Sequence, residues 1–136
     1  MLDTDIAYIA GLFDGEGCIC MRTYTEGGRI PRLVVQIQIS YLPILEKYQT
    51  IFGGHIHHAS RFTNKQLHNW HIGSFKEQLY FLETIFPYLQ EKRTQANAAI
   101  AYLRERILHK DRSRLPESIY ATAKHTSLYL SKEKLM

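Results

Sequence analysis

The sequence predicts an α+β fold, in which one four-stranded antiparallel sheet carries helices on a single face. Four segments alternate apolar and polar residues, and they come in two pairs that each enclose a turn sequence. Segments with helical apolar spacing precede, separate and follow these pairs. The resulting order is helix, strand pair, helix, strand pair, helix, helix. Helices gathered on one face would leave the other face of the sheet open.

Each predicted element begins or ends at a recognisable signal. Thr4 or Asp5 suits the start of the first helix, and Gly15 and Gly17 suit its end. Glycine pairs, asparagine and proline separate the later segments. The predicted elements are a helix to about residue 14, strands over 18–24 and 32–40, a helix over 42–52, strands over 55–61 and 67–73, and helices over 75–86 and 93–108.

These elements form one domain over residues 1–108. Residues 109–136 are polar, and we expect a tail that is loosely ordered or forms a short helix packed on the same domain. Hydrophobic residues make up 45% of the chain and no apolar run could span a bilayer, so no membrane partner is expected. The N-terminus lacks a signal-peptide pattern, which predicts an intracellular protein. We expect Cys18 and Cys20 to be reduced structural thiols.

The first helix has two features that packing against the sheet of its own chain does not explain. Ala7, Gly11 and Gly15 recur every four residues and form a smooth stripe that permits close helix packing. The helix is also apolar almost all round, so it has to be buried on nearly all sides. A twofold copy meets both needs, because it pairs the stripe with itself. The sequence therefore predicts a homodimer, with an interface formed by Ala7, Tyr8, Gly11, Leu12 and Gly15.

Two carboxylates stand at the C-terminal end of the same helix. Asp14 and Glu16 lie where the helix dipole repels negative charge, which is a poor structural choice. Carboxylate oxygens and free terminal carbonyls are good ligands for a hard cation such as Mg²⁺. The pattern therefore favours a cation site at this end of the helix.

The period of two along the strands predicts which side chains face away from the helices. That face is rich in Arg, Gln, Asn and His, which read base edges in a DNA major groove, and it is poor in acids. The net charge of +4 permits nucleic-acid binding without demonstrating it. A zinc site is disfavoured, because no Cys or acid of suitable spacing completes the ligands around the histidines. The residues expected to contact double-stranded DNA are Cys20, Arg22, Tyr24, Arg29, Arg32, Val34, Gln36, Gln38, His55, His57, Arg61, Lys65, Asn69 and His71.

The segment from Ile9 to Gly17 resembles the motif of the LAGLIDADG homing endonucleases, in the variant that ends Asp-Gly-Glu-Gly. The predicted element order resembles that family's fold, αββαββα with a saddle-shaped sheet. The chain carries one copy of the motif, so the resemblance implies a homodimer that hydrolyses both strands of a long pseudo-palindromic DNA site. The alternative within the same fold is a non-cleaving protein, either an RNA-splicing maturase or a transcription regulator, with intron RNA as a partner. An intron or another mobile element is the implied host.

The resemblance also implies catalytic roles. Glu16, with Gly15 beside it, would hold Mg²⁺ at the scissile phosphate, and Mn²⁺ or Ca²⁺ could take the same place. Residues 87–97 resemble the family segment that carries a basic active-site residue. Lys92 matches that residue, which screens charge on the phosphate; the alternative is a solvated lysine.

Two further positions follow from the resemblance. Asp14 matches the first acid of the motif and is expected to support the site rather than bind the metal. A polar residue after the second strand, often Gln, orders active-site water in some relatives. The matching position is Tyr41, or Gln38 if the register shifts, and a tyrosine there leaves room for a protein that binds without cutting.

Overall fold

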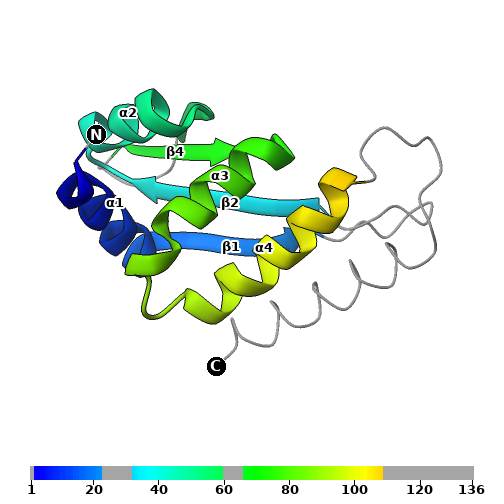
Figure 1. Cartoon of the computed structure of the whole chain (residues 1–136). Helices are drawn as coiled ribbons and strands as arrows, with labels where there is room; N and C mark the ends of the chain where they lie inside the picture. The colour runs from blue at the N-terminus through cyan, green and yellow to red at the C-terminus, as the bar shows by residue number, and fades with distance from the viewer. Residues whose placement is uncertain (1, 23–31, 60–65, 109–136) are drawn as a thin grey trace.

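The computed structural model describes residues 2–22, 32–59 and 66–108 (Figure 1). Its elements are α1 (Asp3–Glu16), β1 (Gly17–Arg22), β2 (Arg32–Ile39), α2 (Leu42–Phe52), β3 (His55–Ala59), β4 (Leu67–Ile72), α3 (Phe75–Ile85), the 3₁₀ helix η1 (Phe86–Tyr88) and α4 (Arg93–Leu108). The predicted order of α-helices and strands is confirmed; the ends of some elements differ, and the short 3₁₀ helix η1 was not predicted. Tyr24, Arg29, Arg61, Lys65 and the tail lie outside the described residues. Across the described ranges, no helix combines the length and apolar content needed to cross a membrane.

The four strands form one antiparallel sheet in the order β1-β2-β4-β3. The register aligns one row of residues across all four strands: Gly17 opposite Ile37, Ile37 opposite Trp70, and Trp70 opposite Ile56. The helices cover a single face of this sheet. In Figure 1, α3 and α4 cross in front of the strands, with α1 and α2 beside them. The α+β architecture predicted from the sequence is therefore present.

The core lies between the sheet and the helices, with Phe81 of α3 at its centre. The Phe81 ring centroid is 5.1 Å from that of Phe13 in α1, 4.8 Å from Phe52 in α2 and 5.0 Å from Trp70 in β4. All four side chains are buried. One aromatic residue thus holds three other elements at once, and its contact with Phe13 fixes the C-terminal part of α1.

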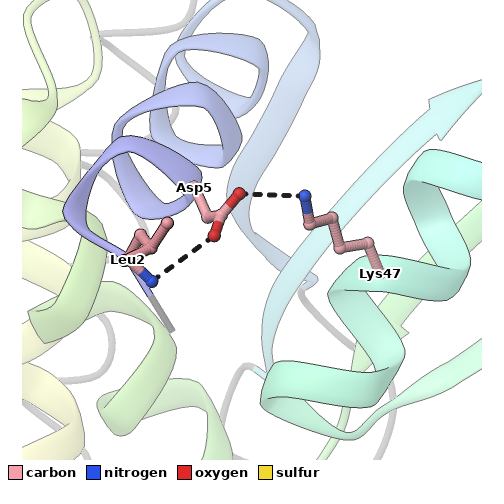
Figure 2. A network of polar contacts seen from close by, with 3 residues as sticks. All are labelled: Leu2, Asp5 and Lys47. Carbon is pink, nitrogen blue, oxygen red and sulfur yellow. Dashed lines mark hydrogen bonds and ion pairs between the residues drawn. The ribbon is translucent and has the colours of Figure 1, made fainter.

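The start of α1 corrects one expectation. Neither Thr4 nor Asp5 is the N-cap; the helix begins at Asp3, with Leu2 at the cap position. Asp5 caps the helix from inside its first turn, because its carboxylate accepts a hydrogen bond from the Leu2 N–H at 3.4 Å. The same carboxylate pairs with Lys47 of α2 at 3.0 Å (Figure 2), and this contact lowers the pKa of Asp5. The carboxylate therefore links the first turn of α1 to α2.

The end of α1 differs as well. Gly15 lies inside the helix, which continues to Glu16. Gly17 ends the helix in an extended conformation, with φ −78° and ψ 173°, which any residue could adopt. Glycine is needed there for space, because a Cβ would lie 2.5 Å from the Phe13 ring. The chain therefore passes from α1 into β1 without a loop, and Glu16 stands at the junction.

Candidate active site and nucleic-acid interface

The junction of α1 and β1 presents a carboxylate to solvent. Glu16 and Gly15 are both exposed there. The last turn of α1 contains no basic residue, so the helix itself does nothing to offset the negative end of its dipole. The terminal carbonyls of the helix and the Glu16 carboxylate consequently form an electronegative end that attracts cations.

A cation from elsewhere in the chain occupies part of this end. Lys92 lies in the turn before α4, and its Nζ donates a hydrogen bond to the Asp14 carbonyl oxygen at 2.6 Å. The Asp14 carboxylate in turn accepts hydrogen bonds from the backbone N–H groups of Gln90 at 3.1 Å, Glu91 at 3.0 Å and Lys92 at 2.7 Å. Asp14 therefore fixes the turn whose lysine returns to the end of α1.

These contacts settle the state of the Asp14 carboxylate. Burial alone would raise the pKa of Asp14, but the backbone donors and the positive charge of Lys92 outweigh burial and leave the pKa below its ordinary value. The carboxylate stays ionised, and its oxygens are engaged by three donors. The Asp14 carboxylate thus holds the turn that carries Lys92, whereas the Glu16 carboxylate is exposed to solvent.

The donor set at this end can be compared with the needs of particular metals. Within the part of the chain that the structure describes, no three His, Cys, Asp or Glu side chains are grouped to hold a metal ion. A zinc centre built from this chain alone does not fit these residues. Mg²⁺ takes one or two protein carboxylates and completes its shell with water and phosphate oxygens. Glu16 therefore fits a magnesium ion shared with a phosphate group.

The strand register distinguishes the two positions expected to orient water. Gly17 is opposite Ile37, so Gln38 is the next residue of β2 beyond the start of β1. Tyr41 follows three residues later, at the N-cap of α2, and is 62% exposed. Along the strand, Gln38 is thus nearer to the Glu16 end of α1 than Tyr41 is.

The sheet's outward face, which points away from the helices, follows the predicted alternation. Cross-strand partners place Cys20 beside Val34, Arg22 beside Arg32, Gln36 beside His71, and both Gln38 and His57 beside Asn69. The sequence prediction omitted some members of this face, among them Cys18 and Leu67, which share the alternation of Cys20 and Asn69. Cys18 lies opposite Gln36, and counting back two residues from Cys20 would have found it. Cys18 and Cys20 form no disulfide.

The outward face is positively charged and hollowed. None of the described residues in the four strands is Asp or Glu. Arg22 and Arg32 are exposed at the edge of a hollow of about 300 Å³, which Gln36, His57 and His71 also line. A surface with cations, amides and imidazoles and without carboxylates is suited to a polyanion with hydrogen-bonding edges.

The comparison with protein families identifies the group to which the chain belongs. The profile of the LAGLIDADG endonuclease family matches residues 9–109. The chain is therefore a member of the LAGLIDADG endonuclease family, and the predicted resemblance is confirmed. No curated protein matches it in sequence.

Solved structures share the fold. The homing endonuclease I-CvuI in complex with its target has a TM-score of 0.74 and 22% identity, covering 96% of this chain and 82% of that chain. The homing endonuclease I-TnaI has a TM-score of 0.58 and 19% identity, covering 96% and 95%. The LAGLIDADG homing endonuclease I-GzeII in complex with its DNA target has a TM-score of 0.69 and 16% identity, covering 92% of this chain and 43% of that chain. At these identities the likeness establishes the fold alone.

Proposed function

We propose that this protein is an intracellular, intron-encoded homing endonuclease that cuts both strands of a long pseudo-palindromic DNA site with Mg²⁺. One observation carries the proposal: the exposed Glu16 carboxylate lies two residues beyond the carbonyl that holds the Lys92 ammonium. Phosphodiester hydrolysis needs an anionic ligand for a metal and a fixed cation for the phosphate, and this junction offers both. Related structures contain DNA targets, and I-CvuI structures were obtained with Ca²⁺ and with Mg²⁺, the latter with its DNA uncleaved.

The residues would divide the work as follows. The Glu16 carboxylate and the Gly15 carbonyl would hold Mg²⁺ beside the scissile phosphate. When bound, Mg²⁺ lowers the pKa of its water and offsets charge on the leaving oxygen. Lys92, fixed by Asp14, would stabilise the negative charge that builds up on the phosphate. Gln38 would orient water, with Tyr41 as the other candidate for that role.

The outward face would bind the DNA. Arg22, Arg32, Gln36, Gln38 and Asn69 have side chains suited to guanine and adenine edges in the major groove. The other predicted contacts would add phosphate binding through their cationic and polar side chains, which positions the protein without reading sequence, and apolar contact with bases through Val34. They are Cys20, Tyr24, Arg29, Val34, His55, His57, Arg61, Lys65 and His71, of which Tyr24, Arg29, Arg61 and Lys65 lie outside the described residues.

Two copies would pair through α1. A Cβ added at Gly11 or Gly15 would meet nothing within 4 Å, so the small-residue stripe borders open space in a single chain. Tyr8 on the same helix is 58% exposed. Pairing would cover this surface, which also includes Ala7 and Leu12, and would bring two Glu16 junctions together for the two DNA strands.

A cleavage screen tests the proposal. The wild-type protein, incubated with a random-sequence DNA library and Mg²⁺, should select and cut a site, and replacing Mg²⁺ with EDTA should stop cutting. Glu16→Gln keeps the shape of the side chain but removes its charge, so it should bind the selected site and cut it at least about 1,000-fold more slowly. Glu46→Gln alters an exposed acid of α2 and serves as the matched control, with an unchanged rate expected.

The wild-type protein and the Glu16→Gln variant each have an outcome that would contradict part of the proposal. If wild-type protein binds the library and leaves it intact at every Mg²⁺ concentration, the nuclease proposal is overturned and a binding protein of this fold replaces it. If Glu16→Gln cuts as fast as wild type, the nuclease stands but Glu16 is not the metal ligand.

A further inference from the structure

Histidines are concentrated at one end of the sheet. Of the seven in the chain, five lie in β3 and β4, and three of these share the outward face: His55, His57 and His71. The rings of His57 and His71 stack with centroids 4.8 Å apart and planes 7° from parallel. The His55 ring centroid is 5.7 Å from that of His71. We call these three residues the histidine row.

Among the described residues, the strands around the histidine row carry no negative charge that could balance a protonated imidazole. On the outward face of the neighbouring strands the charged groups are Arg32 of β2 and Arg22 of β1, and the thiols of Cys18 and Cys20 are the other titratable groups. Arg22 and Arg32 line the same hollow as His57 and His71. None of the described strand residues is acidic.

Protonation of His71 in the free protein is therefore unfavourable. Partial burial is the largest influence, and together with His57, His55 and Arg32 it lowers the pKa of His71. Charging both stacked rings would also set two cations about 5 Å apart with no carboxylate between them. Near neutral pH, His71 is then an uncharged imidazole on an otherwise cationic face.

We infer that the histidine row couples DNA binding to proton uptake, so that the protein binds DNA more tightly as the pH falls. The inference rests on the proposed DNA-binding function of the outward face. DNA phosphates would supply the negative charge that the sheet lacks, and this favours the imidazolium form. The coupling is reciprocal: if DNA raises the affinity of the row for protons, protons raise its affinity for DNA by the same factor.

Linkage between proton binding and DNA binding gives the direction and the size of the expected change in DNA affinity with pH. A histidine is cationic when protonated, so DNA raises its pKa above the free-protein value. DNA binding is accompanied by proton uptake when the pH lies between the pKa of the free protein and the pKa of the DNA complex. The affinity for DNA therefore grows as the pH falls through the pKa of the complex, and it levels off below the pKa of the free protein. Uptake of one proton strengthens binding by at most about tenfold per pH unit. We expect about tenfold tighter binding at about pH 6 than at about pH 8.

The test is equilibrium binding followed by fluorescence anisotropy. The probe is a labelled random-sequence duplex in EDTA at constant ionic strength, which prevents cleavage and holds the salt contribution fixed. The double variant with His57→Gln and His71→Gln keeps hydrogen-bonding side chains but cannot take up protons in this range. Because both residues are predicted DNA contacts, the variant should bind more weakly than wild type at about pH 8, and its affinity should change much less than that of wild type between about pH 8 and about pH 6.

The matched control is His58→Gln. His58 is on the same strand but on the helix side, where its Nδ1 lies 2.6 Å from that of His68. This variant should retain the pH dependence of wild type, and circular dichroism checks that all the proteins are folded. A readout other than affinity is the titration of His71 by NMR, in which DNA should move its pKa upward.

The outcomes separate the inference from the proposed function. Wild-type affinity that does not change with pH overturns the inference and leaves DNA binding intact. A folded double variant whose pH dependence equals that of wild type assigns the proton uptake to other groups, and also overturns it. Absence of DNA binding at every pH overturns the proposed function and this inference with it.

Discussion

At the scale of single residues, the Asp14 carboxylate joins two segments that are far apart in the sequence. It ties the end of α1 to a turn 76 to 78 positions further along the chain. Hydrogen bonds to a charged acceptor contribute about 1.5–3 kcal/mol each, more than neutral ones. Because the turn carries Lys92, the same contacts that stabilise the fold also fix the position of the ammonium.

Replacing this carboxylate should have a pH-dependent cost. Asp14→Asn loses the charge and one acceptor, so we expect the free energy of unfolding to fall by about 1–3 kcal/mol at about pH 7. The pKa of Asp14 lies below its ordinary value of 3.8. A lowered pKa means that its stabilisation is fully present above the unfolded-state value and disappears as the pH falls through the folded-state value.

Urea unfolding at several pH values measures this effect. The difference between wild type and Asp14→Asn should shrink between about pH 7 and about pH 2.5. Asp3→Asn, at an exposed acid of the same helix, should stay within about 0.5 kcal/mol of wild type throughout. A difference for Asp14→Asn that stays constant with pH contradicts the role given to its charge.

The sequence could predict some of these residues but not their geometry. Glu16 and Lys92 are recognisable because their side chains belong to motifs. The partners of the Asp14 carboxylate are backbone N–H groups, which every non-proline residue carries, so nothing in residues 90–92 marks them. The choice between Gln38 and Tyr41 depends on strand register, which becomes visible only when the strands are paired.

At the scale of elements, the connection between α2 and β3 is held by a glycine pair. Gly53 and Gly54 have φ values of 79° and 85°, which L side chains rarely adopt. The Gly53 carbonyl accepts a hydrogen bond from the Trp70 Nε1 at 2.8 Å. A Cβ at Gly54 would lie 2.6 Å from the His71 carbonyl oxygen. The pair thus sets the position of β3 against β4, and with it the histidine row.

Gly54→Ala should therefore be strongly destabilising. Backbone strain and the contact with a carbonyl oxygen together should lower the free energy of unfolding by about 2–4 kcal/mol, measured by urea unfolding. Gly73→Ala is the matched control, because its Cβ would meet only the flexible end of Arg32, at 3.3 Å, and φ there is not positive. We expect that variant within about 0.5 kcal/mol of wild type. Equal stability of the two variants would show that neither strain nor space at Gly54 matters.

The elements themselves were largely predictable, because their signals are local. The alternation in β2 and the bounds of α2 and α4 follow from apolar periodicity. The ends of α1 were not, since they depend on side-chain contacts that apolar periodicity does not reveal. Asp5 caps from inside the helix with help from Lys47, and α1 extends to Glu16 because Gly17 lets β1 start against the Phe13 ring.

At the scale of the whole molecule, acidic residues and exposed apolar residues lie on different parts of the surface from the outward face of the sheet. The acids of the described chain lie on the helices and their connections, while the outward face of the sheet has none. The exposed stripe of α1 sits beside the Glu16 junction rather than over the core. A partner docked on the stripe would cover Gly15, which the stripe shares with the junction, but it would leave the outward face of the sheet open to DNA, so the two proposed contacts would use different faces of the molecule.

The dimer can be tested without disturbing the monomer. Gly11→Leu places a large side chain where a Cβ meets nothing within 4 Å in one chain, so the monomer should fold normally. In a helix pair packed through this stripe, two leucines would separate the backbones and weaken the dimer by about 100-fold or more. Sedimentation equilibrium should give wild type twice the 15.9 kDa mass of one chain and the variant a single mass. Ala101→Leu, at an exposed position of α4, should remain dimeric. A wild-type monomer at high concentration, or a Gly11→Leu dimer of unchanged affinity, would contradict pairing through α1, and the two DNA strands would then need another arrangement of Glu16.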